Sequence, residues 1–192
     1  QATLDNGLTY VNVYGSSTDL TFNPAGPTFE ATGKLNPFSS NIIRQATSML
    51  IDRNYIVQEI MGGLALPRYT PLAASVPDYA RYVATVRAIE ARFAYNPEKA
   101  AEMIDAEMTA MGATGSSAGG WRYEGEAVEV IFLIRIEDER RQIGDYIANQ
   151  LETVGFTVVR DYKSSSEASP LWIFGNARWS LAPLYRWLGR IW

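Results

Sequence analysis

Alternating apolar and polar residues predict several β-strands. Residues 8–14 and 20–23 are rich in β-forming side chains and follow a period of two. Residues 127–134 give the clearest strand. One face carries Val128, Val130, Phe132 and Ile134, and the other carries Ile131 and Leu133. Both faces are apolar, as in a strand that is buried on two sides.

The spacing of apolar residues becomes helical after residue 39. Ser39 and Ser40 are candidate N-caps of a helix. Its expected buried stripe is Ile42, Ile43, Ala46, Met49 and Leu50. Asp52 is a candidate cap of a second helix, which we expect to end at Gly62 and Gly63. The inward side chains of this second helix are Ile56, Val57 and Ile60.

Two further helices are predicted in the middle of the chain. Residues 78–93 have a helical pattern that is polar on most sides. Asn96 and Pro97 form a cap and a first helical residue, and Gly112 is the expected stop. The buried stripe of this helix is Ala100, Ile104, Met108 and Met111. We interpret residues 24–38, 64–77 and 113–120 as loops.

A β-α-β unit follows. Residues 137–154 predict a helix with acids at its start and an inward stripe of Ile143, Ile147, Leu151 and Val154. Gly155 ends this helix, and residues 156–159 predict the next strand. Because such a crossover joins parallel strands, the chain is expected to be an α/β protein.

Composition narrows the chemistry. The 192 residues are 47% hydrophobic and 20% charged, with a net charge of −4 and no Cys or His. Thiolate metal sites, cysteine nucleophiles, disulfide scaffolds and histidine-based triads are therefore excluded. The sequence contains no block of basic residues, which argues against a nucleic-acid partner. The longest apolar run, residues 130–134, is far shorter than a membrane span.

Three local features are candidates for chemistry. Residues 137–141 contain three acids and two arginines, and we interpret them as acids opposing a helix dipole beside solvated arginines. Residues 112–120 lack the Gly-Lys-Ser/Thr ending of a phosphate loop. The tryptophans are candidates for a pocket or for the core: Trp121, Trp172, Trp179, Trp187 and Trp192. No catalytic constellation, cofactor or metal is expected, which favours a binding module.

Several recognisable segments follow one another along the chain. Residues 41–57, which include Asp52 and Arg53, are followed by Gly62-Gly63 and a proline loop. Residues 95–100, with the sequence Tyr-Asn-Pro-Glu-Lys-Ala, come next. A helix and strand over residues 147–158 complete the set, with Leu-Glu-Thr-Val-Gly-Phe-Thr-Val at their junction. This order of segments resembles family 5 of the extracytoplasmic solute-binding proteins of peptide-type ABC importers.

This resemblance implies a fold and a location. The fold is part of one lobe of a type II periplasmic-binding-protein-like fold, a mixed sheet with flanking helices, closing on a second lobe by hinge motion. Residues 1–38 would be crossing strands and a Pro-rich connection from the first lobe, residues 39–178 an incomplete α/β lobe, and residues 179–192 a tail. The location would be extracytoplasmic, with a leader that is not present in this chain.

The resemblance also implies a function. The protein would bind a peptide or similar small solute for delivery to ABC permease subunits, without catalysis. Candidate ligand-binding residues are Trp172, Asn176 and Trp179, which lie near an aromatic strand of the family. A single lobe is expected to bind weakly or not at all, because half of the contacts are missing.

The tail has two interpretations. A one-base shift of a suitable coding sequence for residues 186–189 reads Thr-Gly-Gly-Trp, a motif of the family, so the tail could be an out-of-frame reading. The alternative is an amphipathic helix, since Leu181, Leu184, Leu188 and Ile191 have helical spacing. Sequencing the coding DNA decides between a shifted and an unshifted frame.

Two other functions stay open. One is a small α/β enzyme that uses Asp, Glu and Tyr, which should bring two ionisable groups with opposed environments into one cleft. The other is a partner-binding domain with an exposed apolar face.

Overall fold

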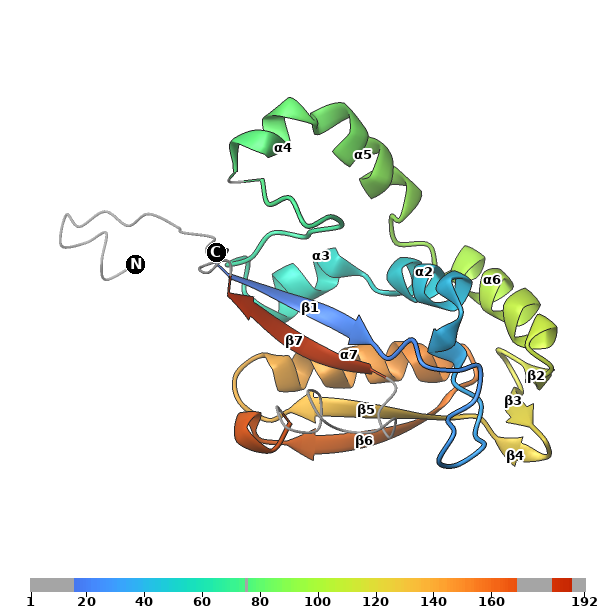
Figure 1. Ribbon diagram of the computed structural model, residues 1–192. Helices are drawn as coiled ribbons and strands as arrows, with labels where there is room; N and C mark the ends of the chain where they lie inside the picture. Colours follow the sequence, from blue (N-terminus) through green and yellow to red (C-terminus); the bar gives the residue numbers. More distant parts are fainter. Residues whose placement is uncertain (1–15, 75, 169–180, 188–192) are drawn as a thin grey trace.

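The computed structural model describes residues 16–74, 76–168 and 181–187. Its main sheet has four strands, in spatial order β1 (Ser16–Phe22), β7 (Leu181–Trp187), β5 (Glu129–Arg135) and β6 (Thr157–Lys163). β5 runs parallel to β6 and to β7, whereas β1 runs antiparallel to β7. The predicted mixed α/β architecture is therefore confirmed (Figure 1).

Helix α7 (Arg140–Thr153) connects β5 to β6 and lies against one face of the sheet (Figure 1). The predicted β-α-β unit and its inward stripe are confirmed, because Ile143, Ile147 and Leu151 are buried. Gly144 marks the closest approach, since a Cβ there would lie 2.6 Å from Cγ2 of Ile134 in β5. The helix begins three residues later than its hydrophobic pattern suggests.

Helices α2 (Asn41–Leu50) and α6 (Pro97–Ala110) pack against each other and complete the core. The Ser40 hydroxyl accepts hydrogen bonds from the backbone of α2, and Asn96 caps α6 by accepting from Lys99 N at 3.0 Å. The two buried stripes are as predicted apart from their ends. Ile42 is exposed because it lies at the edge of the stripe, and Met111 is half-buried.

The second capped helix has an irregular continuation. Asp52 Oδ1 accepts from the backbone of α3 (Arg53–Tyr55), as expected for a cap. The chain then enters a π-helical turn, η2 (Ile56–Ile60), in which Val57 is the fully buried residue. Positive φ angles of 58° at Gly62 and 77° at Gly63 end this segment where the sequence indicates.

Residues 77–92 form two helices, α4 (Pro77–Arg81) and α5 (Val83–Arg92), instead of one. The break lies at Tyr82, whose φ of −110° and ψ of 20° are not helical. Val86 is the one residue of the two helices that is fully buried. In Figure 1 they form an arm that stands away from the sheet.

A small antiparallel sheet begins within residues 113–120, which we interpreted as a loop. It contains β2 (Thr114–Ser116), β3 (Gly120–Tyr123) and β4 (Glu126–Ala127). Trp121 explains its position, because the indole is 2% exposed and donates to Val154 O at 3.0 Å. The loop interpretation of residues 113–120 is wrong for Thr114–Ser116 and Gly120, because this tertiary contact, absent from the local pattern, holds the strands in place; residues 117–119 form the turn between β2 and β3.

The secondary-structure predictions for the two ends of the chain are only partly confirmed. The strand expected at residues 8–14 lies outside the described residues, and the second strand begins earlier than predicted, at Ser16. The helical interpretation of the tail is wrong for Leu181–Trp187, which pair with β1 along their whole length. The connection over residues 24–38 contains one short helix, η1 (Pro37–Ser39), and an isolated bridge between Thr28 and Leu35.

No helix within the described part of the chain combines the length and apolar character needed to cross a bilayer.

Candidate functional site

One end of the main sheet collects the ends of its parallel strands. β5, β6 and β7 all finish there, and β1 begins there because it is antiparallel to β7, with Ser16 opposite Trp187 (Figure 1). α7 also starts at this end. In open α/β sheets ligands bind outside the carboxyl ends of the strands. We call residues 135–140 and 163–167 the carboxyl edge and treat them as the candidate site.

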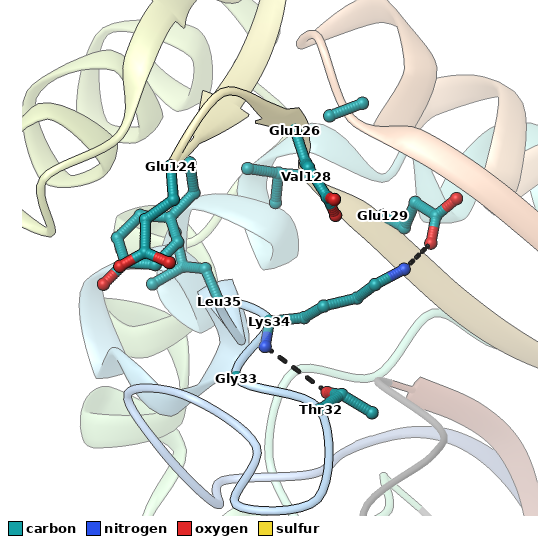
Figure 2. Close-up of a pocket in the computed structure, with 10 residues that line it drawn as sticks. Thr32, Gly33, Lys34, Leu35, Glu124, Glu126, Val128 and Glu129 are labelled. Carbon is teal, nitrogen blue, oxygen red and sulfur yellow. Dashed lines mark hydrogen bonds and ion pairs between the residues drawn. The ribbon is translucent and has the colours of Figure 1, made fainter.

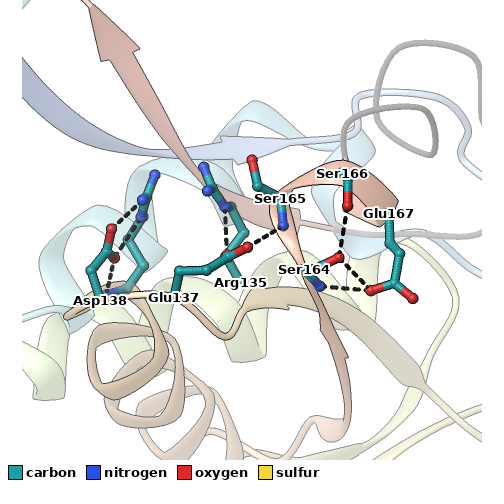
Figure 3. A network of polar contacts seen from close by, with 8 residues as sticks. Arg135, Glu137, Asp138, Ser164, Ser165, Ser166 and Glu167 are labelled. Atoms are coloured by element: carbon teal, nitrogen blue, oxygen red, sulfur yellow. Dashed lines mark hydrogen bonds and ion pairs between the residues drawn. The ribbon is translucent and has the colours of Figure 1, made fainter.

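Hydrogen bonds join the two segments of the carboxyl edge. Glu137, just after β5, accepts from Arg135 Nε at 3.3 Å and from the backbone N of Ser165, just after β6, at 2.6 Å (Figure 3). The Ser165 hydrogen bond is the main reason why the pKa of Glu137 lies below its ordinary value. The carboxylate of Glu137 therefore fixes the position of one segment relative to the other.

Asp138 and Arg140 form the second contact of the edge. The Asp138 carboxylate accepts from Arg140 N at 3.0 Å and Nε at 2.7 Å, and also pairs with Nη2. Asp138 has a φ of 57°, which turns its side chain back onto the start of α7. Hydrogen bonds from the Arg140 side chain lower the pKa of the Asp138 carboxyl.

This pair corrects our interpretation of the acidic cluster. The acids precede α7 instead of forming its first turn, and Arg140 is only 8% exposed. The positive φ of Asp138 delays the helix, and the carboxylate satisfies the guanidinium as it becomes buried. Arg141, in contrast, is exposed as expected.

The segment after β6 is held by its own turn. Ser164 donates to Glu167 Oε2 through its backbone N at 2.9 Å and its hydroxyl at 2.6 Å (Figure 3). The serine hydroxyl is the main cause of a lowered pKa for Glu167. The chain leaves the described region after Ala168 and returns at Leu181, opposite Phe132 of β5.

The chemistry of the edge is that of polar recognition. It offers guanidinium, carboxylate, hydroxyl and backbone groups on a rigid end of the sheet. Each of its carboxyl groups with a shifted pKa is shifted downward, so these groups are anionic at neutral pH. Among the residues that the structure describes, no three acidic side chains gather in a way that could hold a metal ion.

A hollow lies at the opposite end of β5 from the carboxyl edge. Its volume is about 200 Å³, and Lys34 crosses it to reach Glu129 Oε2 at 2.5 Å (Figure 2). Glu124 and Glu126 also line it. The hydrogen bond that Lys34 Nζ donates to Glu129 raises the pKa of Lys34. Since the lysine is already paired within the hollow, this region is a weaker candidate than the carboxyl edge.

The residues predicted from the sequence are only partly placed. Trp172, Asn176 and Trp179 lie outside the described residues. Trp121 belongs to the core. Sequence reasoning missed Arg135 and interpreted Glu137 only as an acid opposing a helix dipole, although polar residues directly after a buried strand are a usable signal for the ligand-binding end of a sheet.

Comparisons with known proteins give a consistent result. The periplasmic oligopeptide-binding protein of an oligopeptide ABC transporter from Thermotoga maritima superposes with a TM-score of 0.70 at 18% identity, over 89% of this chain and 30% of that one. The oligopeptide-binding protein AppA of Bacillus subtilis, solved with a nonapeptide, gives 0.60 at 18% identity, over 97% and 38%. NikA of Brucella suis, solved with Fe(III)-EDTA, gives 0.63 at 17%, over 91% and 33%.

These likenesses establish the fold, and the chain spans between 30% and 38% of the length of these three proteins. A search of curated proteins gave no match. The model of bacterial extracellular solute-binding proteins, family 5 (middle region), matches residues 2–179. The chain therefore belongs to family 5 of the bacterial extracellular solute-binding proteins.

Proposed function

We propose that this chain forms one wall of the solute-binding cleft of an ABC importer's extracytoplasmic binding protein. It holds a peptide or a similar small solute by noncovalent contacts and serves delivery to permease subunits. The observation that carries this proposal is the family match over residues 2–179, combined with a sheet whose carboxyl edge displays fixed polar groups.

The strand order supports a cleft at the carboxyl edge. In a two-lobed binding protein the chain crosses between lobes on adjacent strands. β1 and β7 are adjacent and antiparallel. β1 begins, and β7 ends, at the same end of the sheet as the carboxyl edge. A second lobe connected through such strands would face Arg135, Glu137 and Ser165, and closure would place the solute between them.

The solved neighbours support a broad class of solutes. One was solved with a nonapeptide, one with Fe(III)-EDTA and one with mannohexaose. All three ligands have many polar groups. The carboxyl edge has both charge signs, which suits the two ends of a peptide.

A binding role is also supported over an enzymatic one. General acid catalysis at neutral pH needs a carboxyl group whose pKa is raised. At the carboxyl edge the shifted carboxyl groups, those of Glu137, Asp138 and Glu167, have lowered pKa values instead. They are better suited to holding backbone and arginine groups than to donating protons.

Trp172, Asn176 and Trp179 remain our proposed ligand-binding residues. They belong to the segment between Ala168, which follows the carboxyl edge, and Leu181, which starts β7. We expect peptide to quench or shift tryptophan emission, and Trp172→Phe together with Trp179→Phe to remove that change.

The main experiment is a titration of the 192-residue chain with a peptide library, followed by calorimetry and by backbone NMR. We expect weak or undetectable heat, and shift changes concentrated at residues 135–140 and 163–167. Arg135→Ala should remove those shifts, whereas Arg122→Ala, which changes an arginine of the small sheet outside the carboxyl edge, should not. Tight binding by this chain alone would contradict the one-wall proposal, as would shifts confined to the Lys34 hollow.

A further inference from the structure

A hollow of about 410 Å³ lies on the flank of α7, away from the carboxyl edge. Its lining residues, which we call the tyrosine hollow, are Asp52, Tyr55, Tyr95, Tyr146, Asn149 and Gln150. Three of them come from α7 at positions i, i+3 and i+4, which share one helix flank. Tyr146 lies six residues beyond Arg140, so roughly 9 Å of helix separates the hollow from the edge.

The aromatic part of the hollow is partly fixed and partly open. The rings of Tyr55 and Tyr146 stack with centroids 4.7 Å apart, and the Tyr146 hydroxyl accepts from Asp52 N at 3.0 Å. These contacts hold Tyr146 in place. Tyr55 and Tyr95, however, are 46% and 44% exposed, so large aromatic surfaces border the open space.

The charge of the lining is negative. Asp52 is its one ionisable carboxyl group, and no lysine or arginine lines the hollow. Arg160 donates to Asn149 Oδ1 at 2.7 Å, but the Glu152 carboxylate balances its charge at 2.6 and 2.9 Å. Arg53 is directed elsewhere, to Ser48 O at 2.8 Å and over the Tyr69 ring.

We propose that the tyrosine hollow binds the alkylammonium head group of an organic cation. The faces of tyrosine rings carry negative electrostatic potential and attract cations, most strongly alkylammonium groups that shed water easily. Asp52, whose Oδ1 also caps α3, adds a carboxylate at the same place. This site is separate from the solute cleft and does not depend on it.

A pair of isosteric probes tests the role of charge. Choline and its neutral analogue 3,3-dimethylbutan-1-ol have the same shape, and their binding to the full 192-residue chain is compared by calorimetry and NMR. We expect choline to bind at least about tenfold more tightly than the neutral analogue. Equal binding of the two, or binding of glucose in preference to choline, would overturn the proposal.

Two variants locate the site. Asp52→Asn removes the charge but keeps a good helix cap, and should weaken choline at least about fivefold. Tyr95→Ala should have a similar effect, whereas Tyr82→Ala, an equally exposed tyrosine outside the hollow, should have none. Circular dichroism melts verify that each variant is folded. Unchanged choline binding in both Asp52→Asn and Tyr95→Ala would overturn the assignment.

The alkylammonium group could belong to a free organic cation or to a lipid headgroup. Sedimentation with phosphatidylcholine vesicles distinguishes them, because choline binding without vesicle binding assigns a soluble cation. Vesicle binding that Tyr95→Ala abolishes assigns the headgroup. Either result supports the hollow as an alkylammonium site, and binding to neither probe excludes it. Peptide-induced shifts at the carboxyl edge report on the other proposal separately.

Discussion

Helices α5 and α6 are neighbours in the sequence but are held in very different ways. α6 buries Ala100, Ile104 and Met108 completely, and Asn96 caps its start. α5 buries only Val86, and its N-terminus has no side-chain cap. Since helical stability in proteins comes mainly from tertiary packing of an apolar face, α6 is part of the core and α5 is an appendage.

This contrast indicates which parts of the chain are rigid. The carboxyl edge is supported by α7, β5 and β6, all of which contribute buried residues to the core. The arm of α4 and α5 has few buried contacts and a break at Tyr82. Segments with few buried contacts open at low free-energy cost. Among the described residues, the arm is therefore the segment best able to change its conformation.

The largest predicted effect tests that contrast directly. Ile104→Ala in α6 should lower the free energy of unfolding by about 2–5 kcal/mol, because it leaves a cavity in the core. Val86→Ala in α5 should cost about 1 kcal/mol or less, since the arm can open without the core. Urea denaturation monitored by circular dichroism measures both. Similar losses for the two variants would show that the arm belongs to the core after all.

A second prediction concerns the close packing of α7. Gly144→Ala improves helix propensity, yet its methyl group would lie 2.6 Å from Ile134 Cγ2, so we expect a net loss of about 1–3 kcal/mol. Thermal melts provide the measurement. The double variant with Ile134→Ala should lose less than the sum of the single changes. Additive losses would mean that the contact with Ile134 is not the cause.

The third prediction concerns acid pH. Arg140 holds the pKa of Asp138 below its ordinary value of 3.8 in the folded state. The stabilisation from this pair is therefore complete above the unfolded-state pKa and disappears as the pH falls through the folded-state pKa. Asp138→Asn should cost about 1 kcal/mol at neutral pH, because Asp138 is partly exposed.

The readout for Asp138→Asn is the free energy of unfolding followed from pH 7 downward. The variant should show a smaller loss of stability on acidification than the parent chain. Glu152→Gln serves as a comparison variant, because Arg160 lowers the pKa of the Glu152 carboxyl group, which lies outside the carboxyl edge. A pH profile identical to that of the parent would refute the role of Asp138.

The smallest effect is expected on the arm. Arg87 pairs with Glu90 at 2.9 Å on α5, but its side chain is 69% exposed. Arg87→Ala should change the free energy of unfolding by less than about 0.5 kcal/mol. In the parent chain and in the Arg87→Ala variant alike, backbone amide hydrogens of α4 and α5 should exchange faster than those of α6. Slow exchange throughout the arm would argue against its independence.

Local chemistry was enough to predict many elements near the site. The cap at Ser40, the cap at Asn96 and the stop at Gly155 depend on residues within a few positions of each other. Asp52 was predicted for the same reason. The links within the carboxyl edge were not predictable, because Glu137 and Ser165 are 28 residues apart in the chain.

Periodicity and capping by themselves determined the β-α-β unit and the buried stripes of α2 and α6. The order of recognisable sequence segments carried the resemblance to a family, which the comparisons confirmed. The tertiary structure decided that Leu181–Trp187 form a strand and that Arg140 is buried. Helical spacing of leucines is overridden when a neighbouring strand offers a full set of backbone partners. A buried charge likewise depends on a carboxylate whose direction only the folded backbone sets.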